Sequence, residues 1–219
     1  MSDSAEGIAG FVLAGGRSSR MGEDKALMEL EGRPLIAHAL EVSRTAGLAP
    51  KIAGARTDLS KFAQVIADDE DGRGPLAGVV SALKSTVLGW AVFLSVDMPL
   101  MAPELMGCLI RSAQATGAAI TLTSVNGFAQ TFPTVVRRKV LPSLHECLER
   151  DEGGCFSAFS AAAQQQGEHV QVLAAEALAQ SGLVADARGL WPYQWFQNVN
   201  TPEDLEGAAA ALLRAHRII

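Results

Sequence analysis

The sequence predicts an α/β fold of three layers, in which helices cover both faces of a mostly parallel central sheet. The first observation behind this prediction is composition: 48% of the 219 residues are hydrophobic and 19% are charged, which is typical of a globular chain with one sizeable core. The second is that short apolar segments alternate with segments of helical periodicity along the chain. The third is that no proline- or serine-rich linker interrupts this alternation. We therefore expect one domain over 1–219.

The short apolar segments predict the strands of the sheet. They lie at 8–13, 51–54, 64–67, 90–96, 118–124, 130–136 and 170–173. The segment 90–96 is the strongest, because it is apolar on both faces as a central parallel strand should be. Pro133 has no N–H to donate, so we expect it at an edge or a bulge of the sheet.

Helices are expected between these strands. They lie over about 33–46, 79–86, 140–148 and 156–165, and another starts near 102–104. Pro34 suits the first position of the first helix, where a missing N–H costs nothing. A final helix is expected from Thr201 to about Ile219, because Thr201 and Asp204 form a Thr-x-x-Asp capping pattern.

The segment 13–25, which joins the first strand to the first helix, is rich in glycine and in basic residues: Gly15, Gly16, Gly22, Arg17, Arg20 and Lys25. Paired glycines let the main chain approach a ligand closely, and consecutive N–H groups form an anion site. Arginine and lysine add cationic donors for phosphate oxygens. We expect this segment to hold a polyphosphate, with the N–H groups of residues 14–16 cradling it. The alternative is a solvated turn, and the spacing matches neither GxxxxGK[ST] nor GxGxxG.

Two carboxylates follow predicted strands, where ligands of open parallel sheets bind. Asp97 ends the strongest strand, and a carboxylate beside a phosphate site suits Mg²⁺, which prefers oxygen ligands. The alternative is that Asp97 caps the helix that starts near 102–104. Asp68 begins an acidic run after 64–67, and it either contacts a ribose or base or belongs to a solvated turn.

Two further segments complete the candidate site. Gly74 and Gly78 would let the backbone approach a flat ring, although a purely structural turn is the alternative. Asn198 and Asn200 alternate as at a strand end, with both amides on one side. These amides serve either local hydrogen bonds or a substrate.

The charge balance and the cysteines exclude several classes of protein. A net charge of −6 argues against general binding of nucleic acid, which usually requires a basic face. The three cysteines form no CxxC and no secreted framework. No apolar run approaches the ~20 residues of a membrane helix, and the polar start lacks the apolar region of a signal peptide. We expect a cytoplasmic protein without a membrane partner.

The segments LAGGRSSRMGEDK (13–25), GPLAG (74–78), DMP (97–99) and NVNTPEDL (198–205) resemble the signature of nucleotidyltransferases, and most closely that of the molybdenum cofactor guanylyltransferase family. The resemblance implies a Rossmann-like nucleotidyltransferase fold, with a nucleotide-binding half over 1–100 and an acceptor-binding half over 101–219. It also implies transfer of GMP from GTP to molybdopterin, release of pyrophosphate, and handover of the product to molybdoenzymes or other cofactor-synthesis proteins.

The same resemblance implies roles for individual residues. The expected catalytic residues are Lys25, Arg20 and Asp97, with Asp97 as the Mg²⁺ ligand. Asn198 and Asn200 are expected to bind the acceptor. The expected nucleotide-binding residues are Leu13, Ala14, Gly15, Gly16, Lys25, Asp68 and Asp97.

The chain departs from the family at two places. The segment 151–156 lacks a basic pair that members carry, and Ala53-Gly54 stands where many have asparagine. Leu-Ala-Gly-Gly favours the guanylyl enzymes, since cytidylyl relatives more often have Leu-Ala-Ala-Gly. The alternatives are a CTP-dependent molybdopterin cytidylyltransferase, a sugar-phosphate or isoprenoid-precursor nucleotidyltransferase, and a non-catalytic nucleotide-binding module.

Overall fold

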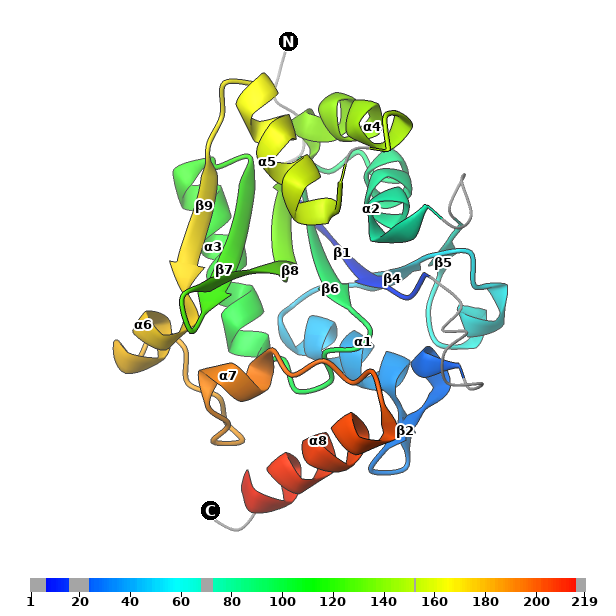
Figure 1. Cartoon of the computed structure of the whole chain (residues 1–219), viewed down its shortest axis with the longest axis vertical. Coiled ribbons are helices and arrows are strands. Elements are labelled where there is room, and N and C mark those ends of the chain that lie inside the picture. The colour runs from blue at the N-terminus through cyan, green and yellow to red at the C-terminus, as the bar shows by residue number, and fades with distance from the viewer. Residues whose placement is uncertain (1–6, 16–23, 68–72, 152, 216–219) are drawn as a thin grey trace.

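The computed structural model describes residues 7–15, 24–67, 73–151 and 153–215 (Figure 1). Within this part, the central sheet has seven strands in the order β5-β4-β1-β6-β8-β7-β9. Their bounds are β1 Ile8–Leu13, β4 Pro50–Ala53, β5 Val65–Ile66, β6 Trp90–Ser95, β7 Ile120–Val125, β8 Phe128–Arg137 and β9 Val170–Ala174. Strand β8 is antiparallel to both neighbours, and the other neighbouring pairs are parallel. The predicted mostly parallel sheet is confirmed.

Helices cover both faces of this sheet (Figure 1). Their bounds are α1 Leu35–Thr45, α2 Gly74–Lys84, α3 Pro103–Thr116, α4 Leu141–Glu149, α5 Cys155–Gln165, α6 Ala175–Gln180, α7 Pro192–Trp195 and α8 Pro202–Ala215. A hairpin of β2 (Glu29–Leu30) and β3 (Arg33–Pro34) precedes α1, and the short 3₁₀ turns are η1 Lys25–Leu27, η2 Thr57–Lys61 and η3 Arg138–Val140.

The alternation of side chains along the strands divides the core into two clusters. Val12 of β1 packs with α1, α3 and α8, whereas Phe11 packs with α2, α4 and α5. On the second face, the rings of Phe11 and Phe93 stack with centroids 5.5 Å apart. Since alternate residues of one strand serve opposite layers, β1 carries no polar side chain and β6 carries one only at its end, Ser95. The three-layer α/β prediction is confirmed.

The ends of some elements differ from the sequence prediction. Helix α2 begins at Gly74 and not at 79, because Pro75 lies in its first turn, where proline is favoured. Pro34 is the N-cap of α1 and closes β3, one position before the predicted place. Residues 198–200 form no strand, and α6 and α7 were not predicted.

Pro133 lies where the pairing of β7 with β8 shifts register. The register shift confirms that Pro133 lies at a bulge, which was one of the two positions predicted for it. Within the described residues, the three cysteines form no disulfide bond. None of the helices in the same part of the chain has the length and apolar character needed to cross a membrane.

Candidate functional site

The carboxyl ends of β1, β4 and β6 meet at one edge of the sheet. Leu13 is the register partner of Ser95, and the N–H of Val96 donates to the carbonyl oxygen of Leu13 at 3.0 Å. A cavity of about 160 Å³ opens at this edge. Its wall is formed by the three strand ends, the first turns of α2, Lys25, Asp97, and Phe132 of β8. The edge that the sequence predicted for ligand binding therefore contains a cavity.

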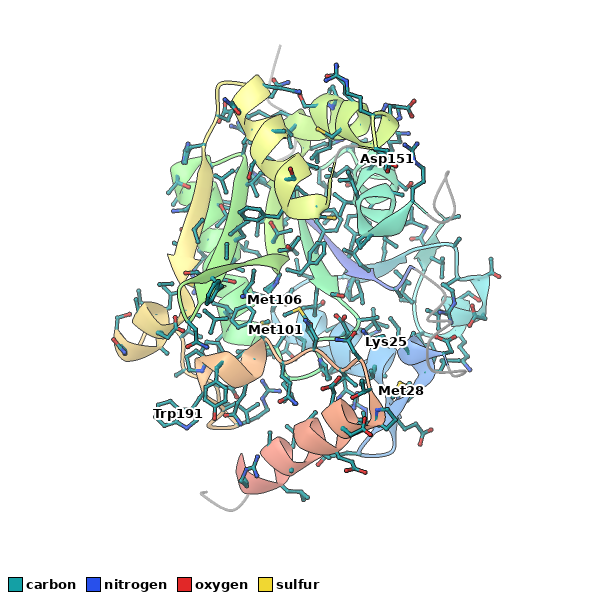
Figure 2. All side chains as sticks on the ribbon, in the orientation of Figure 1. Lys25, Met28, Met101, Met106, Asp151 and Trp191 are labelled. Carbon is teal, nitrogen blue, oxygen red and sulfur yellow. The ribbon has the colours of Figure 1, made fainter. Side chains whose placement is uncertain are left out.

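Lys25, Asp97 and Asn200 come together beside this cavity. Lys25 Nζ donates to Asp97 Oδ2 at 2.8 Å and to Asn200 Oδ1 at 2.5 Å. The side chains of Lys25 and Asp97 are 18% and 20% exposed, so a ligand can reach both. Lys25 lies near the end of β6 and the segment that leads into α8 (Figure 2). The structure thus joins three residues that the sequence placed in the site on separate grounds.

Asp97 is the predicted Mg²⁺ ligand. Its Oδ1 is buried and has no hydrogen-bond partner among the described residues. The N-cap of α3 is Ala102, without a side-chain cap, so the alternative that Asp97 caps this helix is wrong. A buried carboxylate oxygen without a donor fits a hard divalent cation. Because the described residues hold no group of three or more histidine, cysteine or acidic side chains that could bind a metal, substrate phosphates and water would have to complete the ligand set.

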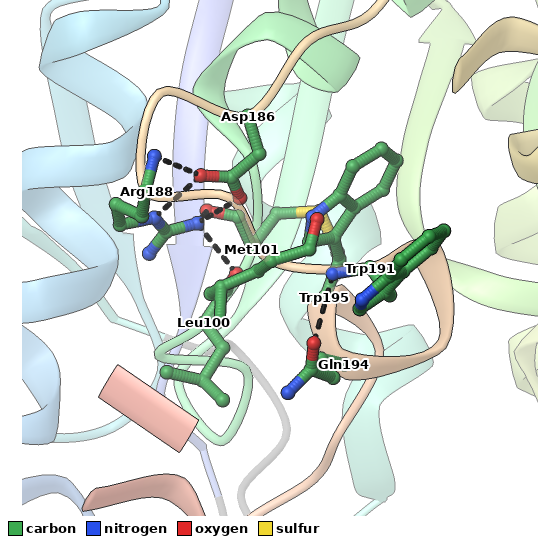
Figure 3. A network of polar contacts seen from close by, with 8 residues as sticks. Leu100, Met101, Asp186, Arg188, Trp191, Gln194 and Trp195 are labelled. Carbon is green, nitrogen blue, oxygen red and sulfur yellow. Dashed lines mark hydrogen bonds and ion pairs between the residues drawn. The ribbon is translucent and has the colours of Figure 1, made fainter. Parts of the chain in front are cut away.

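The C-terminal part of the chain fixes the loop that carries Asp97. The backbone N–H of Val199 donates to the carbonyl oxygen of Asp97 at 2.8 Å. Arg188 Nη2 donates to the carbonyl oxygens of Leu100 and Met101 at 2.8 and 3.1 Å (Figure 3). Arg188 is itself held by Asp186, whose side chain is only 2% exposed. The position of Asp97 therefore depends on contacts from both sides of the loop.

The end of β1 shows which amides are open to a phosphate. The N–H of Ala14 donates to the carbonyl oxygen of Ala53 at 3.0 Å, so it is used by the sheet. The prediction that this N–H cradles a phosphate is therefore wrong for Ala14. Gly15 is exposed and lines the cavity. Gly16, Arg17, Arg20, Gly22 and Asp68 lie outside the described residues, and their predicted roles stay predictions.

Asn198 and Asn200 are exposed on either side of the buried Val199. The alternation of burial that the sequence predicted is thus present, although the segment is not a strand. Asp204 Oδ2 accepts from the N–H groups of Asn200 and Thr201, each at 2.8 Å. The N–H of Asp204 donates to Thr201 Oγ1 at 3.1 Å, as predicted for a capped helix. Chiefly because the Asn200 N–H stabilises its charged form, the pKa of Asp204 is lowered.

The structure adds residues that the sequence analysis did not select. Ser95 and Phe132 line the cavity. A Cβ added at Gly54, where φ is +145°, would lie 2.8 Å from the backbone nitrogen of Gly15. The Ala53-Gly54 departure was visible in the sequence, but only the register of β4 with β1 shows why the position is small. Gly74, Pro75 and Gly78, which lie in the first turns of α2, also line the cavity.

Known proteins are similar to this chain in sequence and in fold. The model of the family described as "MobA-like NTP transferase domain" matches residues 10–170. A protein of Pseudomonas putida named molybdenum cofactor guanylyltransferase is 39% identical over 141 residues, which are 62% of this chain and 73% of that protein.

Two solved structures share the fold. Molybdopterin-guanine dinucleotide biosynthesis protein A from Archaeoglobus fulgidus superposes with a TM-score of 0.74 at 20% identity, over 94% of this chain and 99% of that chain. The Rv0371c protein of Mycobacterium tuberculosis in complex with manganese has a TM-score of 0.62 at 20% identity, over 93% of this chain and 98% of that chain.

Proposed function

Since the chain belongs to the MobA-like NTP transferase family, we propose that it transfers GMP from GTP to molybdopterin and releases pyrophosphate. Membership of this family makes the chain a nucleotidyltransferase enzyme of molybdenum cofactor biosynthesis. The observation that carries the choice of site is the convergence of Lys25, Asp97 and Asn200 at the mouth of the strand-end cavity.

The reaction needs positioning and charge stabilisation more than proton transfer. An oxygen of the acceptor's terminal phosphate attacks the α-phosphorus of GTP. The bond from that phosphorus to the oxygen bridging to the β-phosphate breaks, and pyrophosphate leaves with the electron pair. A phosphate monoester is already an anionic nucleophile near neutral pH. A general base is therefore not required.

Lys25 supplies positive charge where negative charge develops. Its ammonium group is paired with Asp97 and Asn200 in this structure, and a bound triphosphate offers stronger anionic partners. We propose that Lys25 turns to phosphate oxygens when GTP binds, and that Arg20 adds a second cation. A preorganised charge of this kind stabilises the transition state without reorganisation of water.

Asp97 would hold Mg²⁺ through its carboxylate. The buried Oδ1 of Asp97, which has no hydrogen-bond partner among the described residues, supports this assignment. The manganese complex of the structural neighbour supports the use of a divalent cation. When bound, Mg²⁺ would neutralise charge on the phosphate oxygens. Once Lys25 leaves Oδ2, both carboxylate oxygens of Asp97 would be open to ligands.

We propose that the two substrates bind to different halves of the chain. In this proposal, residues 1–100 bind GTP through Leu13, Gly15, Gly16 and Asp68, with Gly74–Gly78 against the base. The N–H of Ala14 stays paired with the carbonyl oxygen of Ala53 and is not a phosphate donor. Residues 101–219 would bind the acceptor, with Asn198 and Asn200 in contact with it. Handover of the product to molybdoenzymes or other cofactor-synthesis proteins belongs to the same proposal.

Thermal unfolding with GTP, CTP, ATP and UTP, each with and without Mg²⁺, tests the nucleotide. A ligand at a hundred times its dissociation constant stabilises by about 2.7 kcal/mol, which shifts a melting curve visibly. We expect the largest shift with GTP and Mg²⁺, followed by pyrophosphate release when molybdopterin is added. A shift with CTP and none with GTP would favour the cytidylyltransferase instead.

A further inference from the structure

We propose that Arg56 is a positioning residue of the nucleotidyl transfer, which holds Lys25 in place through Asp24; this inference rests on the proposed function. Arg56 Nη1 donates to Asp24 Oδ1 at 2.9 Å, and its Nη2 pairs with Asp24 Oδ2. Asp24 is the N-cap of η1, where its Oδ1 also accepts from the N–H of Ala26 at 3.1 Å. Lys25 is the first residue of η1, so the position of its backbone follows that of Asp24.

The connection after β4 braces both ends of the glycine-rich segment. At one end, the N–H of Ala14 donates to Ala53 and the backbone of Gly15 lies against Gly54. At the other end, Arg56 binds Asp24. Residues 53–56 therefore contact both Gly15 and Asp24. We infer that these contacts fix the distance between the Gly15 N–H and Lys25.

Arg56 is itself fixed in one orientation. Its Nε and Nη2 donate to the two oxygens of Asp58 at 2.9 and 2.8 Å. The N–H of Arg56 donates to the carbonyl oxygen of Gly54 at 2.8 Å, and its side chain is 13% exposed. A planar guanidinium forked between two carboxylates transmits position better than a flexible ammonium. Since Arg56 is not among the residues that line the cavity, it acts through Asp24 and not on the substrate.

A positioning role and an ordinary ion pair predict different effects of removing the Arg56 side chain. Both carboxylates paired with Arg56 reach water, since the side chains of Asp24 and Asp58 are 34% and 53% exposed. A salt bridge of this kind contributes about 0–1 kcal/mol to stability, and an ordinary one leaves catalysis unchanged. A catalytic group displaced by about 1 Å can cost about 100-fold in rate. We therefore expect Arg56→Met to lower kcat by about tenfold to a hundredfold. Its melting temperature should fall by only a few degrees.

A double-mutant cycle with Lys25 tests the proposal. Pyrophosphate release is measured for the wild type, Arg56→Met, Lys25→Met and the double variant. If Arg56 acts through Lys25, then Arg56→Met has little further effect once Lys25 is lost, because groups that act as a unit are not additive. Independent effects that multiply, or an unchanged kcat for Arg56→Met, would overturn the proposal.

Two companion variants keep the result interpretable if Arg56→Met folds poorly. Arg56→Lys keeps the charge but loses the fork, so kcat should lie between those of the wild type and Arg56→Met. Arg44→Met is the matched control, because Arg44 pairs with Glu41 within α1 at 3.9 Å and its side chain is 48% exposed, so kcat should stay within about twofold of the wild-type value. An equal loss of kcat in Arg44→Met and Arg56→Met would contradict the proposal.

The same cycle measured by binding separates this inference from the proposed function. Affinity for GTP with Mg²⁺ is obtained from melting shifts of the four proteins, without an acceptor. Absence of pyrophosphate release by the wild type would contradict the proposed function alone. In that case non-additive losses of GTP affinity would still support the link from Arg56 to Lys25, and additive losses would refute it.

Discussion

The backbone N–H of Val199 donates to the carbonyl oxygen of Asp97 at 2.8 Å. This bond joins the segment before α8 to the loop after β6, which carries the candidate metal ligand. Asn200, the next residue, accepts from Lys25 Nζ. The C-terminal segment therefore completes a site whose charged groups come from the first half of the chain.

Asp97→Asn should lower the rate of pyrophosphate release by at least about 100-fold at saturating Mg²⁺, as deletion of one preorganised electrostatic group does. Asparagine keeps the size of the side chain and leaves the bond from Val199 to the backbone intact. Chelation of divalent metal should stop the wild type as well. Glu149→Gln, at an exposed carboxylate of α4, is the control and should keep the wild-type rate. Normal turnover by Asp97→Asn would exclude Asp97 as the metal ligand.

Gly54→Ala should weaken GTP binding because the new Cβ would lie 2.8 Å from the Gly15 nitrogen. Gly47→Ala is a matched control, since Gly47 also has a positive φ, +87°, but nothing lies within 4 Å of its Cβ position. The left-handed conformation alone costs about 1–2 kcal/mol. We expect both variants to lose stability in urea unfolding and only Gly54→Ala to raise KM for GTP. An equal KM for the two variants would show that the contact with Gly15 has no role.

Arg188→Met should destabilise the fold by about 3 kcal/mol, because it leaves a carboxylate buried without its charged partner. That carboxylate belongs to Asp186, whose side chain is 2% exposed. The carbonyl oxygens of Leu100 and Met101 lose a donor at the same time. Denaturant unfolding measures the loss, and adding Asp186→Leu to Arg188→Met should recover much of it. No recovery in the double variant would mean that the carbonyl contacts dominate.

Local patterns in the sequence predicted the strands and the strand-end residues. Six apolar residues of β1 and the run Trp90–Ser95 identify central strands, and Asp97 follows directly. The Thr-x-x-Asp pattern likewise predicted the cap of α8, because capping depends only on residues three positions apart. These strands and this cap needed only neighbouring residues and were confirmed, whereas the predicted first residues of α1 and α2 were wrong.

The same local patterns did not predict the long-range contacts. Arg56 binds Asp24, and Arg188 binds the carbonyls of Leu100 and Met101, yet neither arginine belongs to a local motif. The antiparallel insertion of β8 between β6 and β7 decides where Phe132 lies. The hydrogen bond from the Ala14 N–H to the carbonyl oxygen of Ala53, which removes this N–H from the phosphate site, also depends on strand pairing. Such features follow from tertiary pairing, which a single sequence does not encode as a local pattern.

Acid should weaken the junction between the site and α8 through Asp204. The N–H of Asn200 first, and then Thr201, lower the pKa of this carboxyl below its ordinary value of 3.8. The folded chain then binds fewer protons than the unfolded chain between the two pKa values, so stability rises with pH across that window. The contribution is complete above about pH 4 and is lost as the pH falls below 3.8 through the lower, folded pKa.

Asp204→Asn should remove this contribution and reduce the pH dependence of unfolding below about pH 4. Glu203→Gln, at the adjacent exposed residue of α8, is the control and should keep the wild-type profile. Denaturant unfolding at several pH values gives the profile, and an NMR titration of the Asp204 carboxyl gives its pKa directly. Because the cap positions Asn200, acid should also weaken the hydrogen bond from Lys25 to Asn200 before the core unfolds. An Asp204 pKa at or above 3.8 would contradict the link between the cap and this side of the site.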